Sequence, residues 1–263
     1  MVKNVLKKIY TYAIFLFLYM PIIVLIVFSF NSSKSRAHWT GFTFRWYLEM
    51  FKDRQIMTSL YYTIIIALVA SFIATLLGTV AAIGIVYLKK LPKAIMMNLT
   101  YLPVLNPDIV TGISLMLLFI MLKFPRGFFS MLLAHITFNL PYVILSVMPK
   151  IRQLDNHIYD AALDLGATPS YALTRVILPQ IAPGIFTGFL LAMTMSIDDF
   201  VISFFTTGPG VSNLAITIFS MARKGVSPKI NATLSLLFGF VILSLLIINN
   251  RMNRDNVRKE KVI

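Results

Sequence analysis

The sequence contains no cysteine, which excludes disulfide bonds, thiol catalysis and cysteine ligation of a metal. Its three histidines, His38, His135 and His157, lie far apart in the chain and form no metal-ligand motif. The G-x-x-x-x-G-K-[ST] string of nucleotide-binding P-loops is absent, and no arrangement of Ser, His and Asp suggests a nucleophilic triad. The sequence therefore predicts neither an enzyme nor a chain that binds a cofactor of its own.

Charge is also scarce, since only 13% of the 263 residues are Asp, Glu, Lys or Arg. Hydrophobic residues reach 58%, against about 45–50% in an ordinary soluble domain, and the mean hydropathy is +0.80. A transmembrane helix needs about 20 apolar residues, and six stretches meet this requirement. These predicted spans are 9–30, 59–87, 95–122, 128–148, 184–206 and 231–250. We therefore expect an all-α polytopic membrane protein with six transmembrane helices.

The distribution of basic residues predicts the orientation of these spans. An even number of spans places both termini on one side, and 14 of the 24 Lys and Arg lie on that side. The positive-inside rule makes it the cytoplasmic side. The first span is too long for a signal peptide and lacks a good cleavage site, so we expect an uncleaved signal anchor. The net charge of +14 therefore reflects membrane topology, with a solvated basic tail at 251–263 that touches anionic lipid, and not nucleic-acid binding.

The cytoplasmic segment 152–179 is too polar to span the membrane, yet it has a helical pattern. Gly166 predicts the end of a first helix, and Thr168 with Pro169 predicts the start of a second helix that Pro179 stops. The apolar face of the first helix comprises Leu154, Ile158, Ala161, Ala162 and Leu165. The pattern alone leaves two interpretations open: a helix pair that lies on the membrane surface, or a ridge that docks into a partner protein.

A string within this segment resembles the EAA loop of ABC importer permeases. The pattern of that family is E-A-A, three residues, Gly, nine residues and I-x-L-P. Asp160 stands here in place of Glu, and Val176 stands in place of Ile. The residues at the positions of the pattern are Asp160, Ala161, Ala162, Gly166, Val176, Leu178 and Pro179. The resemblance implies a coupling helix that binds a separate ATPase subunit, which holds Mg-ATP, and it favours the docking interpretation.

Three of the ten acidic residues, Asp108, Asp198 and Asp199, fall inside predicted spans, where no Lys or Arg lies deep. A charge at mid-bilayer costs roughly 2.5–3.5 kcal/mol, so we expect these acids to face a cavity, a partner or a substrate. If the spans are straight, Asp108 and Asp198 both lie roughly 21 Å from the cytoplasmic boundary. We interpret the acids as a relay for an organic cation with several charges, to which aromatic faces add cation–π contacts.

Asp108 also has a structural explanation. With Asn106 as an N-cap and Pro107 at the first helical position, Asp108 becomes an ordinary first-turn acid in a broken span. Asp198 and Asp199 have no such explanation, because the pattern places both in mid-helix. Adjacent helical residues point about 100° apart, so we expect one of the two to face the pathway and the other to bind a backbone group or a partner permease.

Strings along most of the chain, among them "NPDIV", "AHITFNLPYV" and "SIDDFVISFFTTGP", resemble permease subunits of spermidine/putrescine ABC transporters. The resemblance implies the type I importer (MetI-like) permease fold in a bacterial inner membrane. The implied partners are a second permease, two ATPase subunits and an extracytoplasmic polyamine-binding protein. The implied substrate-path residues are Asp108, Asp198, Asp199, Trp46 and Ser196.

The predicted division of the chain is a signal-anchor helix with an outer loop (1–58), a permease domain (59–250) and the basic tail. One rival function keeps the ABC architecture with a metal ion, an anion or another amine as substrate. Buried acids disfavour an anion, and a metal cage needs more ligands than the sequence offers. The other rival is an ion-driven secondary transporter that uses the acids as a proton relay. Dependence on ATP and on a partner ATPase distinguishes the two classes.

Overall fold

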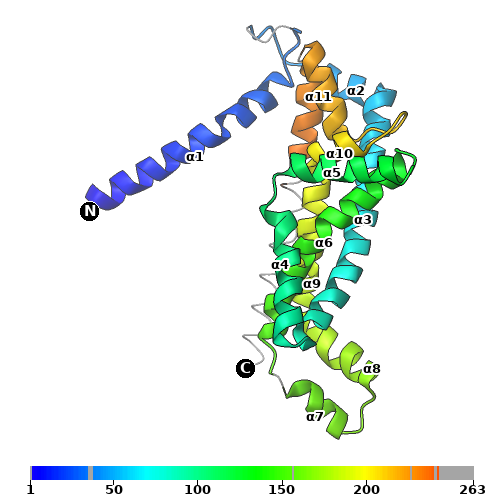
Figure 1. Cartoon of the computed structure of the whole chain (residues 1–263). Helices are drawn as coiled ribbons and strands as arrows, with labels where there is room; N and C mark the ends of the chain where they lie inside the picture. The colour runs from blue at the N-terminus through cyan, green and yellow to red at the C-terminus, as the bar shows by residue number, and fades with distance from the viewer. Residues whose placement is uncertain (1, 35–37, 156, 226, 240–241, 243–263) are drawn as a thin grey trace. The chain divides into compact units, whose positions relative to one another are not determined.

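The computed structural model describes residues 2–34, 38–155, 157–225, 227–239 and 242. Within these residues the regular structure is helical, apart from an isolated antiparallel bridge between Asn31 and Phe42. The chain divides into two compact units, one of Met1–Met57 with Ile218–Ile263 and one of Thr58–Thr217 (Figure 1). The predicted all-α class is confirmed.

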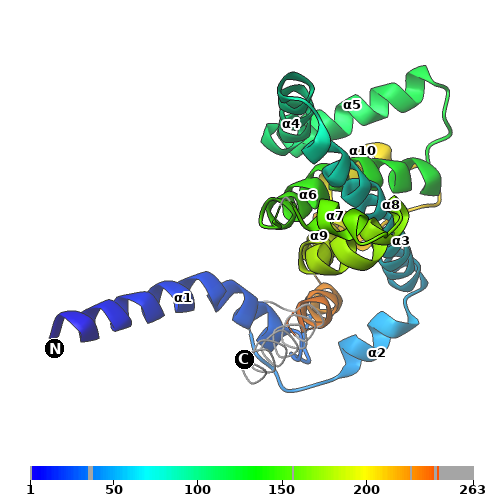
Figure 2. The ribbon, with the colours of Figure 1, turned by 90° about the horizontal axis from the view of Figure 1, so that it is seen from below.

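The second unit contains three long helices. α3 (Arg54–Tyr87), which enters this unit at Thr58, and α6 (Phe128–Arg152) are each long and apolar enough to cross a membrane. α9 (Leu178–Asp198) also reaches this length, together with the short helical turns that precede it. Figure 2 shows the three helices side by side, viewed close to their axes. Their shared core therefore runs along the length of the unit.

Two groups of shorter helices lie at opposite ends of this unit (Figure 1). α7 (Ile158–Asp164) and α8 (Pro169–Tyr171) form a hairpin at one end. α5 (Asp108–Met121) and α10 (Val201–Thr206) lie at the other end. α4 (Lys90–Leu105) runs between the two ends and meets α5 at a bend of 106°.

Glycines on α9 allow it to pack closely against α6. A Cβ atom on Gly188 would lie 3.3 Å from Cα of Val143, and one on Gly184 would lie 2.8 Å from Cγ of Lys150. Small residues four positions apart are a usual means of bringing two membrane helices together. The buried apolar residues around this contact are Ala74, Ala82, Ile85, Val143, Ile144, Val147, Met148, Ile177, Ile181 and Ala192.

The structure tests the six predicted spans individually. The first, second and fourth are confirmed as the single helices Lys7–Phe28, Arg54–Tyr87 and Phe128–Arg152. The third is the bent pair of α4 and α5. The fifth is wrong in its extent, because the helix begins before 184 and ends at Asp198. The sixth, 231–250, lies partly outside the described residues, of which 228–239 are helical, so a count of six is not confirmed. The basic tail lies wholly outside them.

The first unit contains α1 (Val2–Phe28), α2 (Arg45–Lys52) and most of α11 (Leu214–Lys224). Asn31 organises the loop after α1, because its side-chain amide donates to the carbonyl oxygen of His38 at 2.8 Å. Nε1 of Trp46 donates in turn to the carbonyl oxygen of Asn31 at 2.6 Å, and Trp46 is only 3% exposed. Nζ of Lys229 lies 2.9 Å from Oδ2 of Asp53, which links the N-terminal and C-terminal segments of this unit.

Candidate functional site

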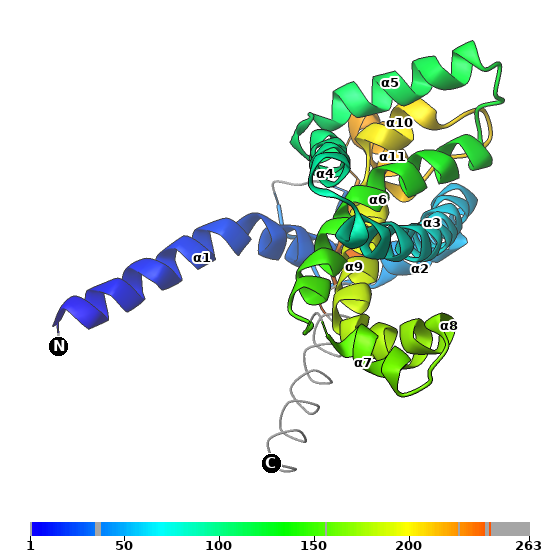
Figure 3. The same ribbon diagram turned by 60° about the horizontal axis from the view of Figure 1, so that its bottom comes forward.

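Two helix breaks in the second unit come together around the predicted acids. One break separates α4 from α5, and the other separates α9 from α10. Figures 1 and 3 show α5 lying alongside α10. The approach is close, because a Cβ atom on Gly112 of α5 would lie 3.0 Å from the ring of Phe205, at the end of α10. The two breaks therefore bring Asp108 to the same pocket as Asp198 and Asp199.

The break between α4 and α5 follows from the sequence Asn106-Pro107. Proline has no backbone N–H and disfavours the helical conformation for the residue before it, and Asn106 is extended. The predicted capping role of Asn106 is wrong, since Pro107 occupies the cap position without a side-chain hydrogen bond. Asp108 is confirmed as an acid in the first turn of α5, where the helix dipole favours it. The depth expected from a straight span therefore does not apply.

The pocket at these breaks has a volume of about 360 Å³. Its lining residues are Asp108, Phe138, Thr194, Met195, Asp198, Asp199, Phe200 and Val201, none of which is basic. Asp108 and Asp198 are exposed, whereas Asp199 is only 9% exposed. No group of three or more His, Asp or Glu within the described part of the chain has an arrangement that could hold a metal ion. The pocket is therefore acidic and partly aromatic.

Asp199 lies in the break after α9, and its carboxylate binds the first turn of α10. Oδ1 accepts from the backbone N–H of Ile202 at 3.2 Å, and Oδ2 accepts from that of Ser203 at 2.7 Å. The first amides of a helix have no partner within the helix, so the carboxylate satisfies donors that are otherwise unpaired. The expectation that both acids lie in mid-helix is therefore wrong: Asp198 ends α9, and Asp199 binds backbone groups.

A buried polar network lies behind the carboxylate of Asp199. His135 on α6 is 1% exposed, and its Nδ1 and Nε2 atoms lie 2.9 Å from the hydroxyl oxygens of Ser196 and Ser203, respectively. Nδ2 of Asn139 also donates to the hydroxyl of Ser196 at 2.9 Å. Nε2 of His135 lies 3.5 Å from Oδ2 of Asp199. Polar groups with little access to water are stable only when paired, and here one helix, α6, pairs those of α9 and α10.

The sequence did not select His135 or Asn139 as site residues. The available signal was two polar residues four positions apart in an apolar span, which places them on one helical face. Of the residues that the resemblance implied, Ser196 belongs to this network, is 1% exposed and does not line the pocket. Trp46 lies buried in the first unit. The roles of Ser196 and Trp46 as substrate contacts stay predictions.

The hairpin at the other end of the unit has the turn that the sequence predicts. Gly166 has φ +86°, a conformation that residues with a side chain rarely adopt, and it comes directly after Leu165, the C-cap of α7. Oγ1 of Thr168 accepts from the backbone N–H of Tyr171 at 3.3 Å and so caps α8, with Pro169 at its first position. Asp160 and Ala161 lie exposed on α7.

Pro179 does not stop the second helix of this hairpin. The chain passes from α8 through the π-helical turn η1 (Ala172–Ile177) directly into α9, whose first turn contains Pro179. A π-turn widens the backbone, and this relieves the clash between a proline ring and the preceding turn. The predicted end at Pro179 is therefore wrong, and a single helical run extends from Pro169 to Asp198.

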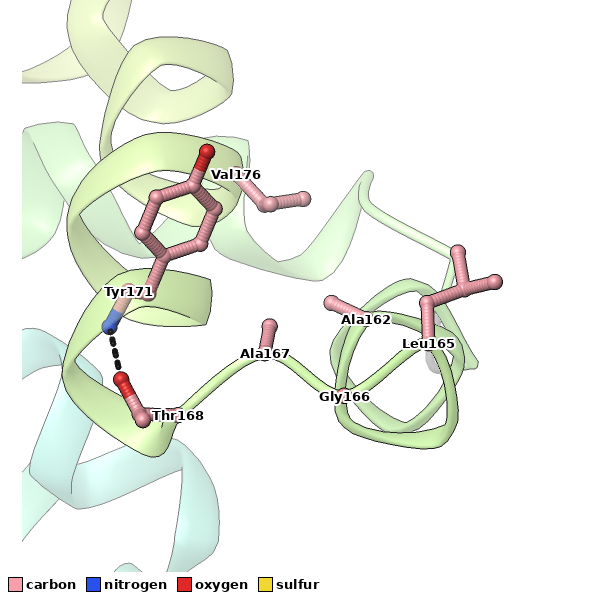
Figure 4. Close-up of a pocket in the computed structure, with 7 residues that line it drawn as sticks. All are labelled: Ala162, Leu165, Gly166, Ala167, Thr168, Tyr171 and Val176. Atoms are coloured by element: carbon pink, nitrogen blue, oxygen red, sulfur yellow. Dashed lines mark hydrogen bonds between the residues drawn. The ribbon is translucent and has the colours of Figure 1, made fainter.

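The predicted apolar ridge divides into an inner and an outer part. Leu154 and Ile158 pack against the core of α3, α6 and α9. Leu165, at the other end of the ridge, is 89% exposed, and Tyr171 on α8, which the prediction did not include, is 57% exposed. Figure 4 shows the groove between α7 and the second helix, lined by Ala162, Leu165, Gly166, Ala167, Thr168, Tyr171 and Val176. The hairpin therefore presents apolar surface that the described part of the chain leaves exposed.

Comparison with known sequences places these features in a family context. The family model described as "Binding-protein-dependent transport system inner membrane component" matches residues 74–255. The putrescine transport system permease protein PotI of Escherichia coli (strain K12) is 40% identical over 221 residues, which cover 81% of this chain and 78% of that protein. The spermidine/putrescine transport system permease protein PotC of the same strain is 36% identical over 248 residues, covering 94% and 93%.

Solved structures share the fold at lower sequence identity. A chain of a bacterial ABC transporter involved in the import of the acidic polysaccharide alginate matches with a TM-score of 0.70 and 17% identity, over 96% of this chain and 97% of that one. A chain of an amino acid ABC transporter with histidines matches with a TM-score of 0.57 and 20% identity, over 78% and 97%. The predicted importer permease fold is confirmed.

Proposed function

Because the chain belongs to the binding-protein-dependent transport system inner membrane component family, we propose that it is the membrane-spanning permease subunit of an ATP-driven polyamine importer. The observation that carries the substrate class is the acidic pocket at the two helix breaks. Relatives that cover most of the chain are named as putrescine and spermidine/putrescine permeases. The proposed substrates are accordingly putrescine and spermidine.

The chemistry of the pocket suits a flexible chain that carries several ammonium groups. Asp108 and Asp198 offer exposed carboxylates from two different helices, and Phe138 and Phe200 offer aromatic faces between apolar surfaces. The fold does not decide the substrate, since the alginate transporter with the same fold imports an acidic polysaccharide. A few weak contacts in sequence favour passage over retention.

The hairpin of α7 and α8 is the proposed coupling element. Its exposed groove and the EAA-like residues Asp160, Ala161 and Gly166 suit docking into a partner ATPase, which binds and hydrolyses Mg-ATP. The helical run from Pro169 to Asp198 connects this groove to the acidic pocket without interruption. A movement imposed on the hairpin by nucleotide binding can therefore reach the carboxylate that ends α9.

The proposed assembly contains a second permease, two ATPase subunits and an extracytoplasmic polyamine-binding protein that docks on the outer loops. The proposed location is a bacterial inner membrane with both termini in the cytoplasm. The exposed apolar faces of α4 and α5 then contact lipid or the second permease. Function as an ion-driven transporter would need no ATPase, so dependence on ATP separates the two classes.

Uptake of labelled spermidine and putrescine by cells that carry the whole transporter tests this proposal. Wild type is compared with Asp198→Asn at matched levels of assembled complex. Loss of one charge-assisted contact of roughly 1.5–3 kcal/mol predicts uptake about 10- to 100-fold lower at subsaturating substrate. Glu49→Gln is the matched control, because Glu49 forms an exposed ion pair with Arg45 on α2 and does not line the pocket.

Two outcomes would contradict the proposal. An assembled wild-type transporter that imports neither polyamine would refute the substrate class, although the family assignment would stand. Uptake that continues after the partner ATPase is inactivated would refute the ATP-driven mechanism.

A further inference from the structure

The two adjacent acids of the pocket have different surroundings, and we propose that Asp199 is a positioning residue and not a substrate ligand. Together with His135 it fixes the break between α9 and α10, so that Asp198 is the member of the pair presented to the cation. This inference rests on the proposed function. The sequence predicted that one of the two acids faces the pathway, and the backbone contacts of Asp199 indicate which one does not.

The exposure of the two side chains differs although both residues line the same pocket. Asp198 is exposed, whereas only 6% of the side chain of Asp199 is exposed. A carboxylate that exchanges water for passing ammonium groups has to be reachable from the pocket. Asp198 meets this condition and Asp199 does not.

The carboxylate of Asp199 already has partners on both oxygens. The amides of Ile202 and Ser203 donate to Oδ1 and Oδ2, and Nε2 of His135 lies 3.5 Å from Oδ2. Hydrogen bonds from amides to a carboxylate are stronger than those between neutral groups. Turning this carboxylate toward a substrate would also leave two buried amides unpaired, which makes the movement costly.

His135 connects the two sides of the break. Its ring binds the hydroxyl of Ser196, in the last turn of α9, and that of Ser203, in the first turn of α10. Nδ2 of Asn213 donates to the carbonyl oxygen of Asp199 at 2.7 Å and to the hydroxyl of Ser203 at 2.8 Å. These contacts fix the direction in which α9 ends, and the last residue of α9 is the exposed acid.

A matched series of neutral substitutions separates capping from charge. Asn and Ser keep a side-chain oxygen that accepts from helix amides, whereas Ala does not. We expect Asp199→Asn and Asp199→Ser to keep the KM for polyamine uptake within about twofold of wild type, and Asp199→Ala to raise it at least about fivefold. At position 198 the charge itself is the contact, so Asn, Ser and Ala are expected to raise KM alike. A purely structural role at 199 would reduce the amount of folded complex without changing the KM of the remainder.

Substitutions of His135 test the second half of the proposal. His135→Ala is expected to raise KM as Asp199→Ala does, and the double variant is expected to be no worse than either single variant, because the two side chains act through one network. His135→Gln keeps a polar atom near the position of Nε2 and is expected to stay closer to wild type than the alanine variant. Independent, multiplicative effects of the two alanine substitutions would overturn the role of His135.

Thermal unfolding of the purified complex tests the inference without substrate. Asp199→Ala and His135→Ala are expected to lower the unfolding midpoint, Asp199→Asn, which keeps one of the two acceptor oxygens, is expected to lower it less than Asp199→Ala, and Asp198→Ala is expected to leave it close to wild type. If wild type transports no polyamine, the proposed function fails, and this measurement still decides the positioning role. Asp199→Asn and Asp199→Ser variants as defective as Asp199→Ala, in KM or in unfolding, would show that the charge matters and would overturn the inference.

Discussion

The two ends of the second unit differ in what they bury: one end buries polar groups that are paired, and the other leaves apolar side chains exposed. At the end with the acidic pocket, buried polar groups of α6, α9 and α10 bind one another through His135 and Asn213. At the end with the hairpin, apolar side chains such as Leu165 lie exposed at the groove. The polar end is arranged by the chain itself, and the apolar end has the character of a surface that a partner covers.

This difference suggests a division of labour along α9. A site that is already organised holds its carboxylates in position before substrate arrives, which lowers the entropic cost of binding. The hairpin surface, by contrast, has no such partner within the described chain, so we expect its movement to be set by the protein that docks on it. One helical run from Pro169 to Asp198 joins the proposed substrate site to the proposed coupling surface, and the two share no lining residue.

The largest expected effect comes from placing a charge in the exposed groove. Leu165→Glu is expected to abolish co-purification of the ATPase and to lower uptake at least about 30-fold, since a buried interface anchor is worth about 2 kcal/mol or more. The unfolding midpoint of the isolated permease is expected to stay unchanged, because Leu165 is 89% exposed. Co-purification and uptake are measured side by side.

Gln153→Glu is the control for this variant. It adds the same charge to an exposed residue at the C-terminal end of α6, outside the groove. If Leu165→Glu binds the ATPase as wild type does, the groove is not the docking surface, and the contrast between the two ends has to be abandoned.

A smaller effect is expected at the contact between α6 and α9, which connects the two ends. Gly188→Ala places a Cβ atom 3.3 Å from Cα of Val143, so the helices have to separate slightly. We expect the free energy of unfolding to fall by about 1–3 kcal/mol. Gly84→Ala on α3 is the matched control, since a Cβ atom there meets nothing within 4 Å and alanine favours the helix by about 1 kcal/mol. Equal shifts of the two unfolding midpoints would contradict the close contact.

The two helix breaks show how far the sequence alone could lead. Pro107 lacks an N–H and restricts the residue before it, so the break between α4 and α5 is predictable from local chemistry. The break at Asp199 has no proline or glycine. It is stabilised by His135, more than 60 positions earlier, and by Asn213. A pattern of neighbouring residues does not reveal such long-range contacts.

The same limit explains the error at Pro179. A proline after a short amphipathic helix usually marks its end, but the π-turn before it accommodates the ring. Ile177 lies in that turn and is buried in the core that α3, α6 and α9 share. Sequence alone predicts the helical class, the turn at Gly166 and the presence of acids within apolar spans, because these features depend on composition and on local backbone preference. The pairing of buried polar groups depends on tertiary contacts, which the sequence alone does not reveal.

The smallest expected effect concerns Asp53, an acid that also binds helix amides but lies near solvent. Its Oδ1 accepts from the backbone N–H groups of Gln55 and Ile56 at the start of α3, and its Oδ2 lies 2.9 Å from Nζ of Lys229. Partial burial raises the pKa of this carboxyl. Lys229 and the two amides together lower the pKa by more than burial raises it, so the pKa lies below its usual value of 3.8. A group with a lowered pKa in the folded state stabilises the fold above its unfolded pKa and loses this contribution as the pH falls through the folded value.

Asp53→Asn keeps an oxygen for the helix amides and removes the charge, so at pH 7 it is expected to lower the free energy of unfolding by less than about 1 kcal/mol. The difference from wild type is expected to shrink as the pH falls below 3.8, and Lys229→Gln is expected to reproduce it. Chemical denaturation of both variants at pH 7 and at pH 3 measures these differences. If Asp53→Asn were instead as damaging as Asp199→Ala, burial would not be what separates the two acids, and the contrast between a buried and a solvent-facing helix cap would have to be abandoned.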